Sequence, residues 1–299
     1  NINFSNYGFK RYHFTGQLLG KKIKAKLINN NKNLKFKILK TGIKADFELD
    51  DKNSYLEDNI AGSSKIKLLN NYLKFDFNLN DNEIKINKSN FRNKKISFSL
   101  DSQIKFNPYF HFNSEININE IDNNLLVSLS LDDVLKNRKI IKKLSSEVNI
   151  NYKNKSYFAN LIESHSSNLN FAYGRIVFSS KSVVAGSEVN CNAETLLTEK
   201  DPRLNFTCLS NFENEKNFFK KLSIPNTINN DLQKLNIEGS LNLIYKKVNF
   251  KSIEINDNYS ANKEDIKYFK DAFESILFND GFFQMFNKSK IKEFILAVI

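Results

Sequence analysis

The sequence predicts a mainly β protein: an elongated, curled antiparallel sheet that forms a groove, or a β-sandwich-like arrangement, with an intervening helix and a C-terminal helical pair. Three observations support this class. Apolar and polar residues alternate with a period of two along most of the chain, turns rich in Asn and Asp separate the alternating segments, and helical spacing occurs at only a few places. The 299 residues are 40% hydrophobic, which is enough for a packed core.

The first alternating segments carry lysine on their polar side. Ile23, Ala25 and Leu27 alternate with lysines, and the scheme recurs over residues 34–38 and 43–49. This pattern is typical of strands with one dry and one wet face. We expect residues 1–130 to form a first antiparallel β-array.

The alternation is clearest over residues 62–121. Because alternate residues of a strand share a face, its apolar side chains should form one surface. They are the candidate lining of a groove: Phe75, Phe77, Ile84, Ile86, Phe98, Phe106, Phe110, Phe112, Ile116 and Ile118.

Helical spacing marks the next element and the end of the chain. It predicts an amphipathic helix over residues 131–147, with Ser130 or Asp132 as its cap. Residues 259–299 read as a C-terminal helical element, two helices with an aromatic stripe. That stripe would either pack on the sheet or contact a membrane or a partner.

A second β-array is predicted over residues 148–258, interrupted by a short helical segment near 213–222. Its strands would continue the apolar face through Ile150, Phe171, Phe178 and Phe206. Together the two arrays contain about fifteen strands, and sheets of more than about ten strands usually curl or split. A curled sheet can be packed by its own side chains or can leave an open groove, and the sequence does not choose between them.

Catalytic chemistry is not evident in the sequence. His13, His111 and His165 are far apart and lack metal-ligand spacing, and the Gly16 and Gly20 pair lacks the spacing and the hydroxyl of a phosphate-binding loop. We expect a protein that is not an enzyme and that uses no metal and no cofactor.

The two cysteines lie in strand-like segments that flank the turn near residues 199–203. Hairpin pairing would bring Cys191 and Cys208 within a residue or two of direct opposition. A disulfide, formed in an oxidising compartment, and two buried free thiols are both compatible with this spacing.

The formal charge of +12 comes almost wholly from lysine. Nucleic acid is not an expected partner, because base readout relies on arginine and stacking on exposed aromatics, whereas the aromatics here fall on the opposite parity from the lysines. Anionic lipid head groups would attract the same charge. No stretch is long and apolar enough to cross a membrane, so we expect any anchor to lie upstream of Asn1.

Several short segments carry a family likeness. The chain resembles AsmA-like proteins of Gram-negative bacteria over residues 62–299, most clearly at residues 62–77 (GSSKIKLLNNYLKFDF), 91–94 (FRNK), 105–110 (KFNPYF), 201–208 (DPRLNFTC), 238–243 (EGSLNL), 264–270 (EDIKYFK) and 291–294 (IKEF). The likeness rests on overall residue usage and on these short segments, and it includes no catalytic motif.

The resemblance implies a periplasmic protein anchored in the inner membrane, whose β-groove holds phospholipid acyl chains for lipid transport to the outer membrane or for outer-membrane biogenesis. An outer-membrane or periplasmic protein could contact the C-terminal helices. The competing interpretation is an elongated β scaffold or adhesin-like protein with a closed core.

Overall fold

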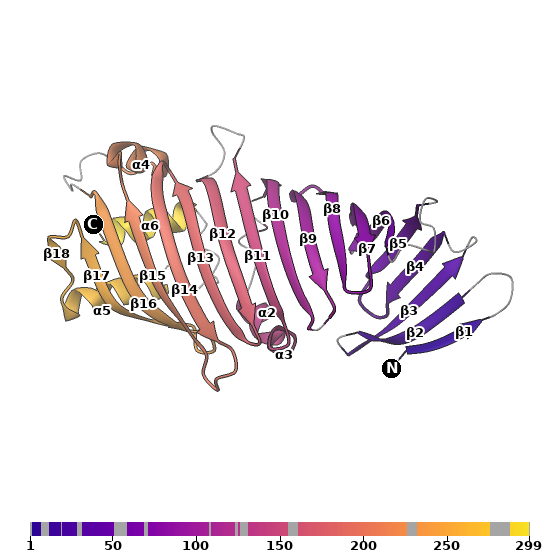
Figure 1. Ribbon diagram of the computed structural model, residues 1–299. Coiled ribbons are helices and arrows are strands. Elements are labelled where there is room, and N and C mark those ends of the chain that lie inside the picture. Colours follow the sequence, from indigo (N-terminus) through magenta and orange to yellow (C-terminus); the bar gives the residue numbers. More distant parts are fainter. Residues whose placement is uncertain are drawn as a thin grey trace. The chain divides into compact units, whose positions relative to one another are not determined.

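The computed structural model describes residues 2–6, 12–18, 20–28, 32–50, 59–68, 71–107, 109–122, 125, 131–154, 161–225, 232–275 and 288–298. The chain divides into two compact units, residues 1–117 and 118–299, and each is described by itself (Figure 1). Both are built from antiparallel strands that follow one another along the chain, so the mainly β, antiparallel fold with helices that the sequence predicts is confirmed.

Unit 1 is a meander in which consecutive strands pair. The strands are β1 Ile2–Asn6, β2 Tyr12–Leu18, β3 Lys21–Ile28, β4 Asn33–Ile38, β5 Lys44–Leu49, β6 Ile60–Leu68, β7 Asn71–Leu79, β8 Glu83–Arg92, β9 Ile96–Lys105 and β10 His111–Ile121. The boundary between the two units falls within β10. Asn side chains shape two of the turns, since Asn80 accepts from the amides of Asn82 and Glu83, and Asn93 accepts from those of Lys95 and Ile96.

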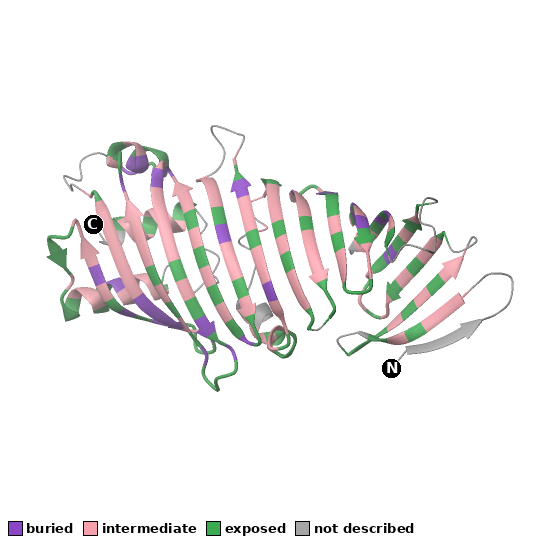
Figure 2. Ribbon diagram, viewed as in Figure 1, coloured by how far each residue is buried: buried purple, intermediate pink, exposed green. Residues whose placement is uncertain are grey.

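The register gathers the apolar residues of unit 1 on one side. Residues directly opposite each other on paired strands share a face, and one such row runs through Phe36, Ala45, Ile66 and Leu73. We call the surface that contains this row the unit 1 apolar face. Figure 2 shows the resulting alternation of exposed and more buried residues along the strands.

A bulge in β8 changes the parity of the alternation. Ile86 and Phe91 both lie on the unit 1 apolar face, although five positions separate them, because β8 holds one residue more than β7 and β9 there. Lys88 takes a left-handed backbone conformation (φ 46°) within this irregular stretch, and Ser89 is buried and accepts a hydrogen bond from the Leu100 amide. The sequence alternation alone would place Phe91 on the wet side.

The core of unit 1 lies under β5 to β9. Leu73, Phe75, Phe77 and Phe91 are buried together. The rings of Phe47 and Phe77 meet edge to face at 5.5 Å, and Phe91 stacks on Phe98 at 4.8 Å. This part of the sheet therefore packs against its own side chains.

Unit 2 combines a second meander with helices. Its elements are α2 Leu131–Lys136, α3 Arg138–Ile141, β11 Ser145–Lys153, β12 Ile162–Ala172, β13 Arg175–Val184, β14 Ser187–Leu196, β15 Arg203–Asn211, α4 Glu215–Leu222, β16 Lys234–Asn242, β17 Lys247–Ile255, β18 Tyr259–Ser260, α5 Lys263–Phe273 and α6 Lys288–Val298. Consecutive strands from β11 to β18 pair antiparallel.

The helices of unit 2 cover only part of its sheet. Phe269 of α5 packs on Val248, Phe250 and Ile253 of β17, and Phe273 meets Phe250 edge to face at 5.6 Å. Helix α4 buries Phe218, Phe219 and Leu222 in a second cluster, which Ile291 and Ile295 of α6 also contact. The side of β16 and β17 that α5 covers is therefore closed.

The predicted helices differ from the observed ones mainly at residues 131–147. Two short helices, α2 and α3, occupy the first part, and β11 begins at Ser145 because residues 145–153 pair with β12 over their whole length. Ser130 lies outside the described residues. At the C-terminal end, a capping box formed by Asn262 and Asp265 starts α5, and residues 276–287, between α5 and α6, lie outside the described residues.

Truncation of a core ring tests the closed part of unit 1. Phe77 is 5% exposed and contacts several apolar side chains, so Phe77→Ala should lower the free energy of unfolding by about 3 to 5 kcal/mol, measured by urea denaturation. Tyr109 is 74% exposed, so Tyr109→Ala is the matched control and should cost less than about 0.5 kcal/mol. Equal losses in the two variants would contradict this description of the core.

Candidate functional site

The open part of the unit 1 apolar face lies at β9 and β10. Phe106 and Phe110 lie in the connection between β9 and β10 and are 42% and 48% exposed. Phe110 lies 6.2 Å from the half-buried ring of Phe112. A Ser102–Ser114 hydroxyl contact of 2.7 Å places the same side of β9 and β10 together. We call Ile104, Phe106, Phe110, Phe112 and Ile116 the β9–β10 patch.

Other predicted lining residues of unit 1 lie in the closed core. Phe75 and Phe77 are 4% and 5% exposed, and Ile84, Ile86 and Phe98 pack against them. A ligand could reach these rings only by separating the cluster. The predicted set is thus divided: five residues are core, and four (Phe106, Phe110, Phe112 and Ile116) belong to the β9–β10 patch, while Ile118 belongs to unit 2 and is half-buried.

Unit 2 has an apolar face of its own. The register places Val148, Leu169 and Phe178 side by side across β11, β12 and β13, with Ile150 and Phe171 on the same side. All five are half-buried, and none belongs to the clusters that contain the helices. We call these five residues the β11–β13 patch. Phe206 is different, because it packs against Phe250 and the α5 cluster.

The ring of Phe206 packs closely on the backbone of β16 at Gly239. Gly239 lies opposite Phe206, and a Cβ at this position would come within 2.8 Å of the Phe206 ring. Glycine therefore allows β15 and β16 to pack closely at the closed end of the unit 2 apolar face.

The two cysteines lie on the unit 2 apolar face as a disulfide. Cys191 of β14 and Cys208 of β15 are directly opposite in the register, and the structure joins their sulfurs. The pair shares a row with Ile150 of the β11–β13 patch. The bond therefore fixes two strands beside the open patch.

His165 is a half-buried titratable residue of β12. It lies opposite Tyr152 and Ser182, and its Nδ1 is 2.8 Å from the Ser182 hydroxyl. Burial disfavours the charged ring and holds the pKa of His165 below its usual range. The imidazole is therefore neutral at pH 7.

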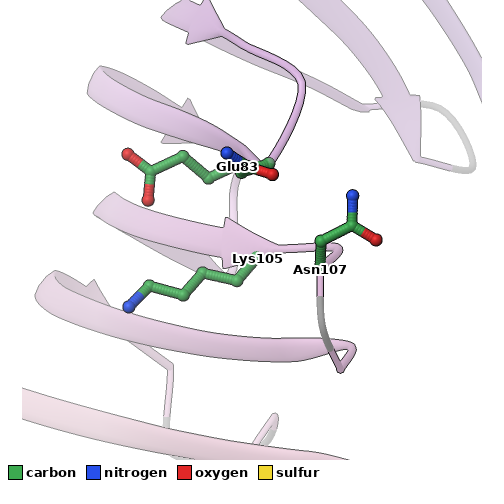
Figure 3. Close-up of a pocket in the computed structure, with 4 residues that line it drawn as sticks. Glu83, Lys105 and Asn107 are labelled. Atoms are coloured by element: carbon green, nitrogen blue, oxygen red, sulfur yellow. The ribbon is translucent and has the colours of Figure 1, made fainter.

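Polar side chains of the described residues also gather away from the two patches. Among the described residues, no three His, Cys, Asp or Glu side chains lie close enough to hold a metal ion. An open depression of about 660 Å³ is lined by Asn82, Glu83, Lys105 and Asn107, but Figure 3 shows Asn107 pointing away from the side that Glu83 and Lys105 share. A hydrogen bond from Gln103, and Lys85 Nζ at 3.0 Å, hold the pKa of Glu83 below its usual range, so this carboxylate stays ionised.

Sequence reasoning missed Phe91 and His165. The bulge in β8 hides Phe91 from a strict alternation. His165 falls on the dry parity of its strand, which could have marked it as a half-buried group.

Comparison with known proteins gives no relative. No family model, no curated protein and no solved structure matches the chain. Among the described helices, none combines the length and the apolar character that crossing a membrane requires.

The lowered pKa of His165 predicts a pH-dependent stability. Because the ring is harder to protonate in the folded state than in the unfolded state, its contribution is complete above about pH 6.5 and is lost as the pH falls through the folded value. The free energy of unfolding should drop less between about pH 7.5 and 5.5 in His165→Gln than in the unchanged protein. The same drop in both proteins would show that His165 is not the group responsible.

Removal of the disulfide should lower the stability of unit 2. The bond closes a loop with a sequence separation of 17, so Cys191→Ser/Cys208→Ser should lower the free energy of unfolding by about 3 kcal/mol. Reductant should bring the unchanged protein to the value of the double variant and leave the variant itself unaffected. A protein indifferent to reductant would not contain the bond.

Proposed function

We propose that the chain is a non-enzymatic lipid-binding protein whose open apolar patches hold phospholipid acyl chains. Its place would be the periplasm, with a membrane anchor outside this sequence, and its role would be phospholipid transport between the inner and outer membranes or outer-membrane biogenesis. The AsmA-like resemblance of residues 62–299 motivates this assignment. The disulfide supports an oxidising compartment.

The observation that carries the proposal is the pair Phe106 and Phe110. Large rings that are 42% and 48% exposed leave apolar area in water beside a face whose other apolar residues are buried or half-buried. An acyl chain lying on them would gain about 0.8 kcal/mol for each buried methylene. Binding of this kind needs no charged or hydrogen-bonding partner for the chain.

The β11–β13 patch provides similar chemistry in unit 2. Its five side chains are aliphatic or phenylalanine, and all are half-buried. Helix α5 covers β17 and leaves this patch outside its cluster. An acyl chain could lie along this half-buried apolar patch, next to the closed core under α5.

A closed scaffold is the second candidate function. The burial of Phe75 and Phe77 against Leu73 and Phe91 supports it, because this cluster leaves no room for a ligand. In that case the function would lie on the outer surface, and Tyr268 and Leu296, which are 56% and 45% exposed on α5 and α6, would offer a contact for an outer-membrane or periplasmic protein. Lipid occupancy separates the two candidates.

Native mass spectrometry of the gently purified chain, followed by crosslinking with a photoactivatable phospholipid, tests the proposal. Phe106→Asp/Phe110→Asp should reduce phospholipid occupancy at least about tenfold, because each carboxylate would have to be desolvated against an acyl chain. The melting temperature should change little, since both rings are largely exposed.

Ile244→Asp/Tyr245→Asp is the matched control, because these neighbouring side chains are 41% and 64% exposed in the turn between β16 and β17. It should retain the lipid. Absence of phospholipid from the unchanged protein, or equal occupancy in the two variants, would favour the closed scaffold.

A further inference from the structure

The polar side of unit 1 contains a row of four lysines that cross four neighbouring strands. Lys24 of β3 lies directly opposite Lys37 of β4, Lys37 lies opposite Lys44 of β5, and Lys44 lies opposite Lys67 of β6. Neighbouring strands are about 4.8 Å apart, so the row places four cations across about 15 Å.

A second row runs beside the first, two residues along each strand. Lys26 lies opposite Lys35, Asp46 follows on β5, and Lys65 lies opposite Lys74. The two rows are about 7 Å apart along the strands. We call the eight lysines of these rows the lysine face; Figure 1 shows the strands β3 to β7 that carry it.

The lysine face keeps an excess of positive charge within the part of the chain that the structure describes, because Asp46, opposite Lys35 and Lys65, is the one carboxylate in its two rows. Seven of the eight are exposed and Lys67 is half-buried, and none of them forms a salt bridge to a described carboxylate. Lys65 instead lies over the Tyr72 ring, with Nζ 4.0 Å from its centroid. The carboxylates Glu48 and Asp76 lie in the next row, and Asp76 already pairs with Lys88 at 3.3 Å.

This arrangement costs stability. Like charges directly opposite each other on paired strands repel, and the lysine face contains five such pairs. A general preference for lysine on outer strand faces does not explain it, because the polar side of unit 2 is different. There, Asn149, Asn168, Ser179 and Asn192 form one row, and Arg175 pairs with Glu194 at 2.9 Å.

The chemistry of the face favours a lipid surface over a nucleic acid. All eight cations are lysines, which act as hydrated point charges, whereas base and phosphate recognition in nucleic acids usually includes arginine forks. The exposed ring beside them, Tyr72, is covered by Lys65. An anionic bilayer presents mobile phosphates that adapt to a two-dimensional array of cations, and each lysine near its surface strengthens binding about fivefold.

We propose that the lysine face of unit 1 docks on the surface of a membrane that contains anionic phospholipid. This inference goes beyond the proposed function and does not rest on it, because it concerns head groups and the opposite side of the sheet from Phe106 and Phe110. Head-group phosphates relieve the repulsion between the lysine rows when the protein binds.

Vesicle co-sedimentation tests the docking. The chain should bind phosphatidylcholine vesicles that contain about 30% phosphatidylglycerol and should not bind phosphatidylcholine alone. Lys24→Gln/Lys37→Gln/Lys44→Gln/Lys67→Gln should bind at least about 100-fold more weakly. The binding should weaken steeply between about 50 and 300 mM NaCl.

The matched control removes four exposed lysines of unit 2 and the same net charge: Lys139→Gln, Lys200→Gln, Lys216→Gln and Lys267→Gln together. It should bind like the unchanged protein. Thermal melts should show that the row variant is folded and at least as stable as the unchanged protein, since its like-charge pairs are gone. Phe106→Asp/Phe110→Asp should still sediment with anionic vesicles, which separates this test from that of lipid occupancy.

Three results would overturn the proposal. They are equal binding of the row variant and its control, equal binding to neutral and anionic vesicles, and displacement of the protein from vesicles by a short oligothymidylate at lower concentration than the lipid phosphate. The last result would assign the face to single-stranded nucleic acid.

Discussion

The antiparallel register is the constraint on which the other features depend. Opposite residues of paired strands share a face, so a single register decides which side chains meet across many strands. The same pairing that sets Lys37 opposite Lys44 also sets Phe36 opposite Ala45. A slip of one residue would exchange the two faces, and both the apolar core and the lysine rows would be lost together. The bulge in β8 preserves this arrangement by correcting the parity between Ile86 and Phe91.

Packing against the apolar side then separates closed from open regions. In unit 1, Phe47 contacts Phe77 and Phe91 stacks on Phe98 within one apolar cluster that spans β5 to β9. In unit 2, α5 does the same for β17. The strands are alike in composition on both sides of these boundaries. Whether the apolar side of a strand is closed therefore depends on what packs on it. Among the described residues, the β9–β10 and β11–β13 patches lie outside the core clusters, and Ser146 and Ser167, on the same side as the β11–β13 patch, are buried.

Sequence alternation predicted the strands, their faces and the opposition of Cys191 and Cys208, because each follows from a local period of two. It could not predict that Phe77 is core while Phe110 is exposed, since the alternation assigns both to the apolar side and they differ in their non-local contacts. It placed the lysines of β3 and β4 on one side but could not align Lys67 with them, because residues 50–59 separate β5 from β6 and the register across that segment is not a local property. The helix predicted over residues 131–147 ends earlier in the structure for a similar reason. From Ser145 onward, the chain pairs with β12 as a strand, and this non-local pairing outweighs the helical spacing.

The sheet of unit 1 separates an acyl chain bound on its apolar side from the lysine face on its polar side. Side chains on opposite faces of a strand point away from each other, and packed layers lie about 10 Å apart, so an acyl chain on the β9–β10 patch has the backbone of the sheet between itself and the lysine face. Its own head group could reach the lysines only around an edge. A lipid whose acyl chain lies on Phe106 and Phe110 therefore does not reach Lys24 and Lys37 directly through the sheet. Docking and acyl-chain binding are thus separable, and a protein that does the first without the second would be a membrane-attached scaffold.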